Sequence, residues 1–236
     1  MSSFLPPDEP PTIARNPSRS LWEAALVGHR EAFAQLAGRT AQAVYARFRA
    51  DGATPAEALA RTEHFFVRLQ TVERPNAAVE DVERLQGFLI QRLAACVEAR
   101  FPEAPETLAE VRPVFDHEQA ERRFLRVNAQ TPDDVFTRRW ALGTLELTLE
   151  TLREEMGNEG KAGLFPHLPQ FLSFSGSEER YAEISEQCGT SVSGLHVAVY
   201  RFRLRYREIL RRLAGDTVRS AEEVDSELTK LLVAAS

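Results

Sequence analysis

Residues 181–212 follow the pattern of a short helix, a tight turn and a long helix, which limits the possible fold more than any other segment. In the first part, three apolar residues recur at the spacing of one helical face: Tyr181, Ile184 and Cys188. Gly189 is placed to end this helix, because glycine readily adopts the left-handed conformation of a helix exit. Ser191 is a suitable N-cap for the helix that follows. The segment therefore predicts a helix-turn-helix within residues 178–213.

The long second helix has one apolar stripe and two polar flanks when its residues are placed at roughly 100° per residue. The apolar stripe consists of Leu195, Val199, Phe202, Tyr206, Ile209 and Leu213. One polar flank consists of Ser193, His196, Tyr200, Arg203, Arg207 and Arg211. The other flank carries Arg201, Arg205 and Arg212. The stripe predicts a buried face, and the flanks are predicted to be available for a partner.

This helix is strongly basic within an acidic chain. Residues 197–219 contain seven arginines, with only Glu208 and Asp216 as acids, so their charge is +5, whereas the whole chain carries −6. Such a separation of charge favours a polyanionic partner for this one helix. A solvated arginine face is the alternative interpretation, but the turn and the N-cap directly upstream favour a nucleic-acid-binding unit.

In a helix-turn-helix, the amino-terminal turns of the second helix read base edges, while basic residues beside them contact phosphates. The residues predicted to contact DNA are therefore Ser191, Ser193, His196, Tyr200, Arg201, Arg203, Arg205 and Arg207. Among them, the serines, the histidine and the tyrosine are expected to set sequence preference, and the arginines to supply affinity.

Helical signals continue through most of the chain. Three capping boxes predict helix starts: Ser20 with Glu23, Thr54 with Glu57, and Ser220 with Glu223. Thr131 as N-cap and Pro132 at N1 predict a long helix that ends at Gly157. Five apolar residues of this helix form a seam, suited to an intramolecular core or to a dimer face: Leu142, Leu145, Leu149, Leu152 and Met156. No segment shows convincing strand alternation, so an all-α fold of two helical domains is expected.

Composition divides the chain into four parts. Residues 1–18 hold five of the thirteen prolines and are predicted to form a flexible tail. Residues 19–101 carry successive helical stripes and predict an amino-terminal domain. Residues 102–131, with recurring prolines, are predicted to be a linker that holds one short helix or strand near residues 115–127. Residues 132–236 are predicted to form the carboxy-terminal domain, which contains the helix-turn-helix and a final helix.

The chain has the composition of a soluble globular protein, with 43% hydrophobic and 27% charged residues. No apolar run approaches the ~18 residues that span a bilayer, and the amino terminus lacks the features of a secretory signal. A cytoplasmic location without membrane association is therefore expected. The five histidines and two cysteines lack metal-ligand spacing, and no glycine-rich phosphate loop is present. We expect neither an enzyme nor a metal or cofactor.

The segment YAEISEQCGTSVSGLHVAVYRFRLRYREIL, which begins at Tyr181, resembles a known domain. It is similar to region 4, the promoter-binding domain of bacterial RNA polymerase sigma factors of the extracytoplasmic-function type. Residues 136–155 resemble the helix ahead of region 4, residues 160–173 the short helix after it, and residues 220–234 a carboxy-terminal extension found in one group of these factors. RADGATPAEALARTEHFFVRL and VERLQGFLIQRL resemble region 2 more loosely.

The resemblance implies promoter DNA and core RNA polymerase as partners, with an anti-sigma or other regulatory protein as a further one. It also implies polymerase contacts near the paired Phe65 and Phe66. The implied polymerase-binding residues are Glu57, Glu63, His64 and Arg68. Region 2 is divergent, however: where the family carries an acid and a Gln–acid pair, this chain has Ala60, Glu63 and His64. Residues 80–100, which are basic in the family, carry three arginines against four acids.

Three hypotheses follow. The first is a sigma factor-like initiation protein that recruits polymerase to promoters through the helix-turn-helix. The second is a helix-turn-helix regulator whose amino-terminal part binds another protein or dimerises, and the divergent region 2 favours it. The third is a sigma-derived interaction module that no longer binds DNA, and the retained arginines argue against it.

Overall fold

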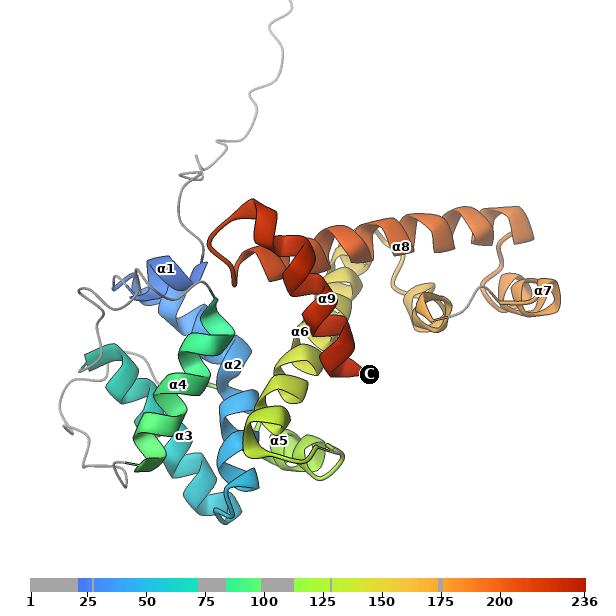
Figure 1. Ribbon diagram of the computed structural model, residues 1–236. Helices are drawn as coiled ribbons and strands as arrows, with labels where there is room; N and C mark the ends of the chain where they lie inside the picture. The colour runs from blue at the N-terminus through green and yellow to red at the C-terminus, as the bar shows by residue number, and fades with distance from the viewer. Residues whose placement is uncertain (1–20, 27, 72–83, 99–112, 128, 174–175) are drawn as a thin grey trace, which may run out of the picture.

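The computed structural model describes residues 21–26, 28–71, 84–98, 113–127, 129–173 and 176–236 (Figure 1). Helices make up most of this part of the chain, and it contains no β-strand, so the all-α prediction is confirmed. The tail predicted for residues 1–18 lies outside the described residues, as does Ser20 of the first capping box. No helix in the described part of the chain combines the length and apolar character needed to span a bilayer.

The α-helices are α1 (Leu21–Leu26), α2 (Arg30–Ala50), α3 (Pro55–Thr71), α4 (Leu85–Glu98), α5 (His117–Phe124), α6 (Pro132–Asn158), α7 (Glu178–Gln187), α8 (Val192–Gly215) and α9 (Val224–Ala235). Three short 3₁₀ helices are η1 (Phe165–His167), η2 (Pro169–Leu172) and η3 (Ala221–Glu223). Helix α5 lies where one short helix or strand was expected.

Several helices begin at capping residues that the sequence predicts. The Glu57 carboxylate accepts hydrogen bonds from the backbone and hydroxyl of Thr54, ahead of α3. Thr131 caps α6 and forms a capping box with Asp134. The third capping box is also present, but Ser220 and Glu223 open η3, and α9 follows directly. These starts are local because donor and acceptor are three residues apart.

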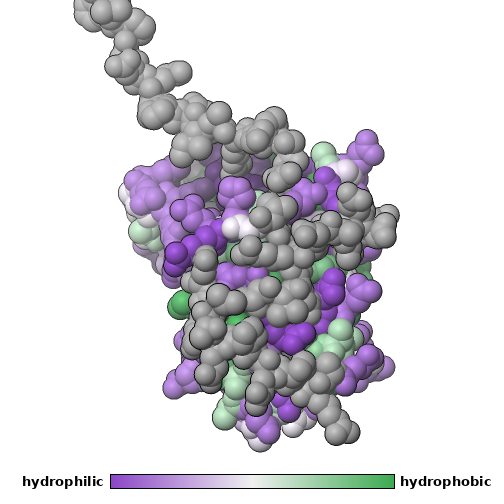
Figure 2. Space-filling model, turned by 90° about the vertical axis from the view of Figure 1, so that its left-hand side faces the viewer, coloured by the Kyte–Doolittle hydropathy of each residue, from purple (hydrophilic) through white to green (hydrophobic). Residues whose placement is uncertain are grey.

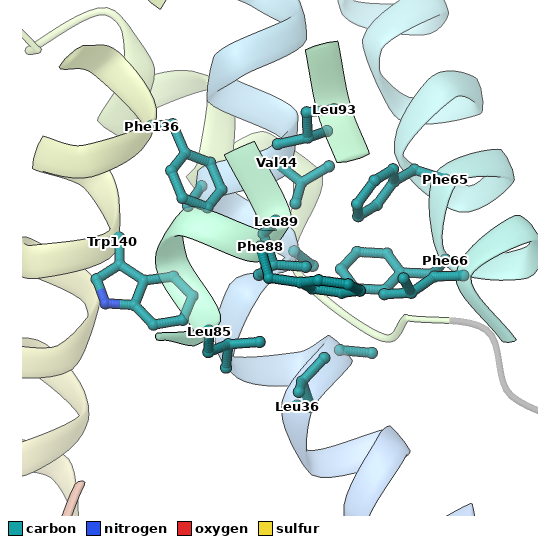
Figure 3. Packing of buried hydrophobic residues seen from close by; sticks show 14 of the residues in the cluster. Leu36, Val44, Phe65, Phe66, Leu85, Phe88, Leu89, Leu93, Phe136 and Trp140 are labelled. Carbon is teal, nitrogen blue, oxygen red and sulfur yellow. The ribbon is translucent and has the colours of Figure 1, made fainter. Parts of the chain in front are cut away.

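A first hydrophobic core surrounds α2, which packs against α1, α3, α5 and α6. Its large side chains come from α1, α3, α4, α6 and α9 as well as from α2. Figure 3 shows Leu36 and Val44 of α2, Phe65 and Phe66 of α3, Leu85, Phe88, Leu89 and Leu93 of α4, and Phe136 and Trp140 of α6. Phe66 packs edge-on against both Phe33 and Phe65.

This first core continues across the predicted linker. Besides Phe136 and Trp140, it includes four buried residues from the carboxy-terminal end of the chain: Ala214, Val218, Val224 and Leu231. Arg47 of α2 also pairs with Asp133 at 2.7 Å, and Arg39 pairs with Asp216 at 3.0 Å. The predicted division into two domains joined by residues 102–131 is therefore not confirmed.

A second hydrophobic core lies at the other end of the molecule. Its buried residues are Leu152, Met156, Leu168, Phe171, Tyr181, Ile184, Leu195, Val199, Phe202, Ile209 and Leu213. The long helices α6 and α8 contribute to both cores, and Figure 1 shows α8 running between α9 and α7. Of the predicted α6 seam, Leu152 and Met156 are buried, whereas Leu142, Leu145 and Leu149 are half-buried.

Helix α9 lies along α6 and contacts α8. Its Glu227 is buried, and the carboxylate lies 3.4 Å from the Arg84 guanidinium, which precedes α4. Burial raises the pKa of Glu227, and the nearby Arg84 opposes this shift. Figure 2 shows the molecule from the left-hand side of Figure 1, where hydrophilic residues predominate among the coloured ones.

Candidate nucleic-acid interface

Helices α7 and α8 are joined by a tight turn at residues 188–191. Gly189 has a φ of +62°, the left-handed conformation for which glycine was expected here. The Ser191 hydroxyl then caps α8 by accepting from the Gly194 backbone N–H at 3.1 Å. The local chemistry of this turn is as the sequence predicts.

Helix α7 packs across the amino-terminal part of α8 (Figure 1). Tyr181 and Ile184 of α7 lie in the second core with the α8 stripe. The predicted stripe faces inward: five of its six members are buried, and Tyr206 is half-buried. The opposite face of α8 is thereby turned outward at a fixed orientation.

His196, which the sequence predicts to read bases, is exposed, with 43% of its side chain accessible, and its ring also contacts α7. Its ring stacks on Tyr181, with centroids 3.8 Å apart and an angle of 17° between the planes. Tyr181 in turn stacks on Phe171 at 4.7 Å. His196 Nε2 also lies 3.9 Å from the Glu178 carboxylate. The side chain therefore contributes to the α7–α8 contact through its stack on Tyr181.

Arg203, which the sequence predicts to contact DNA, links α8 to η2. Its Nε and Nη2 both donate to the carbonyl oxygen of Phe171, at 2.8 and 2.6 Å. Two charge-assisted hydrogen bonds from one guanidinium to the same carbonyl oxygen stabilise the contact between α8 and η2. Arg203 is half-exposed, and its Nε and Nη2 are engaged within the chain, so its contact with DNA stays a prediction.

Arg205 is also held by protein groups. It makes two hydrogen bonds to Glu155 of α6, at 2.8 and 2.7 Å, and a third to Glu208 at 2.9 Å. These bonds raise the pKa of Arg205, and the bond from Arg205 is the main reason that the pKa of Glu155 is lowered. Arg205 is nevertheless exposed, so its contact with phosphate stays a prediction.

The outward face of α8 carries the remaining predicted residues. Ser193, Tyr200, Arg201 and Arg207 are all exposed, and Tyr200 retains 68% of its accessible surface. Two exposed apolar residues lie beside them, Val197 at 49% and Leu204 at 47%. Val197, Tyr200 and Leu204 follow the i, i+3, i+7 spacing and lie opposite the buried stripe. The helical projection that predicts the buried stripe also places these three residues together. The sequence-based prediction of DNA contacts included Tyr200 but missed Val197 and Leu204.

The four predicted polymerase-binding residues all lie on α3. Glu57 is exposed and serves as the capping carboxylate of this helix, and its pKa is lowered mainly by the backbone hydrogen bond from Thr54. Glu63, His64 and Arg68 are half-buried. Residues 57, 64 and 68 share one side of α3 at i, i+7 and i+11 spacing, whereas Glu63 lies on another side.

Comparisons with protein-family models, curated proteins and solved structures found no match. Within the described residues, no group of histidine, cysteine, aspartate or glutamate side chains is arranged to hold a metal ion.

Proposed function

We propose that this protein is a sigma factor-like transcription initiation protein that recruits RNA polymerase to promoters through α7 and α8. The observation that carries this proposal is the exposed outward face of α8, which the second core holds in place. Ser193 and Tyr200 lie on this face near the amino-terminal end of α8, the part that enters the major groove in helix-turn-helix proteins.

Arg201 and Arg207 supply the positive charge for this role. At roughly 100° per residue, they lie on opposite sides of the outward face, about equally far from its centre. This placement suits contacts to the two phosphate strands that border a groove. The apolar surface of Val197 and Leu204 between them suits the methyl group of thymine, which is read by apolar contact in the major groove.

A helix-turn-helix regulator that does not act as a sigma factor is the second candidate. The packing of α2 against α6 favours it, since one continuous core joins the region 2-like helices to the carboxy-terminal half. The role of Glu57 as a helix cap points the same way, because this carboxylate is already engaged within the chain.

Promoter-directed transcription in vitro separates these candidates. The full chain is added to core RNA polymerase and a set of promoter fragments, and the same fragments are used in a binding assay without polymerase. We expect specific transcripts, and the double replacement of Arg201 and Arg207 by Gln should abolish both transcripts and binding. Replacement of Arg122 and Arg153, exposed arginines on α5 and α6, is the matched control and should change neither.

DNA binding without transcripts would instead identify a regulator. If the chain neither binds the fragments nor supports transcription, the proposed function is wrong.

A further inference from the structure

A cleft of about 410 Å³ lies away from the outward face of α8, between α2, α5, α6 and α8. Four arginines and two glutamates line it: Arg39, Arg123, Arg139, Arg212, Glu146 and Glu150. Its volume falls within the range of about 300–1,000 Å³ that is typical of small-molecule sites. Neutral hydrogen-bonding side chains, among them Gln42 and Gln119, complete the lining.

The arginines of this cleft outnumber their acidic partners. Arg123 and Arg139 share one carboxylate, that of Glu146, at 3.1 and 2.7 Å. Because one carboxylate balances only one guanidinium, a full positive charge remains in this group. Arg39 has its own partner, Asp216, and Arg212 is exposed at the edge of the cleft.

Arg139 has the most unusual environment of the four. Only 3% of the residue is exposed, and within the described residues its Nε has no hydrogen-bond partner. A buried charge without full hydrogen bonding is unfavourable, and because Arg139 lines the cleft, an anion bound there would offset its charge. Guanidinium groups bind phosphate with paired hydrogen bonds, so adjacent arginines with excess charge form a suitable phosphate site.

We propose that this cleft binds a small phosphorylated molecule, with its phosphate at Arg123 and Arg139. The excess charge favours the phosphate, and the remaining volume with its glutamine side chains accommodates a polar organic group. Since residues of α2 and α8 both line the cleft, the ligand would bridge the first core and the basic helix. The site is separate from the outward face of α8, so it does not depend on DNA binding.

Isothermal titration calorimetry of the full chain at constant ionic strength tests this proposal. The probes are inorganic phosphate, adenosine 5′-monophosphate and adenosine. We expect saturable binding of both phosphate-bearing probes and none of adenosine. Arg123→Gln should weaken phosphate binding about tenfold or more, the loss expected for one charge-assisted hydrogen bond. Arg122→Gln, on the same helix but paired with Glu118 outside the cleft, should bind as the unmodified chain does.

Arg212→Gln provides a second variant that leaves the buried group intact, and Arg211→Gln is its neighbouring control. Arg212→Gln should weaken binding of adenosine 5′-monophosphate, whereas Arg211→Gln should not. The proposal is overturned if neither phosphate-bearing probe saturates, or if each cleft variant binds as well as its control. Binding of a short DNA duplex that is weakened by the cleft variants, with no binding of the small probes, would also overturn it and assign these arginines to nucleic acid.

Discussion

Replacing Arg203 by Met tests whether this arginine stabilises the fold, in contrast to Arg207, for which we propose a contact with DNA. Methionine keeps much of the aliphatic side chain but removes both donors to the Phe171 carbonyl. A hydrogen bond from a charged donor contributes about 1.5–3 kcal/mol to stability. Because the two bonds share one acceptor and Arg203 is half-exposed, we expect a loss of about 2 kcal/mol for the pair. Arg207→Met, on the same helix but exposed, should change stability by less than about 0.5 kcal/mol.

Urea unfolding followed by far-UV circular dichroism measures these differences. Both tryptophans, Trp22 and Trp140, lie in the first core, so their fluorescence reports separately on the part of the molecule that Arg203 does not touch. If the second core opens first, the dichroism signal of Arg203→Met should change at a lower urea concentration than the tryptophan fluorescence.

For DNA binding, we expect the larger effect from Arg207→Met and the smaller one from Arg203→Met. Removing one phosphate-binding side chain makes the slope of log affinity against log salt shallower by about 0.9. We expect this change for Arg207→Met, and an unchanged slope for Arg203→Met at temperatures where the variant is folded. The reasoning is refuted if the two variants are equally stable while Arg203→Met shows the shallower slope.

Three other predictions concern separate parts of the molecule. Tyr200→Ala should weaken preference at one or two base pairs by about 1–3 kcal/mol, measured by selecting bound sequences from a randomised pool. Burial and the hydrogen bond to Glu121 raise the pKa of Tyr45 to about 12. The protonated phenol therefore stabilises the fold below its ordinary pKa of about 10, and this stability is lost as pH rises toward 12. Tyr45→Phe should remove that alkaline step in urea unfolding. Arg84→Met should destabilise the chain by about 2 kcal/mol because Glu227 is then buried without its partner, and adding Glu227→Gln should restore most of the stability.

The sequence predicted features that depend on neighbouring residues. The Thr131 cap, the Gly189 turn and the buried stripe of α8 all arise from contacts or periodicity within a few residues along the chain. Such signals are readable without a partner segment, because each one is complete within a single helix or turn.

The roles of individual arginines could not be predicted in the same way. Arg203 donates to a carbonyl 32 residues away, and the Glu155 that holds Arg205 is 50 residues away. Helical projection gives the flank of a residue but not the group that faces it from another element. The stack of His196 on Tyr181 has the same origin: the two residues belong to different helices, and the packing of these helices brings them together.

The boundary at residues 102–131 leads to a final prediction. A fragment that ends at residue 131 lacks Phe136 and Trp140, which are buried in the first core. Fully burying a large apolar side chain contributes about 1.5–3 kcal/mol, so losing both removes a large part of a typical stability of about 5–15 kcal/mol. We expect this fragment to unfold without a cooperative transition and to bind a hydrophobic dye, whereas the full chain should unfold cooperatively. If this fragment instead unfolds cooperatively and is as stable as the full chain, the residues before 132 form an independent domain.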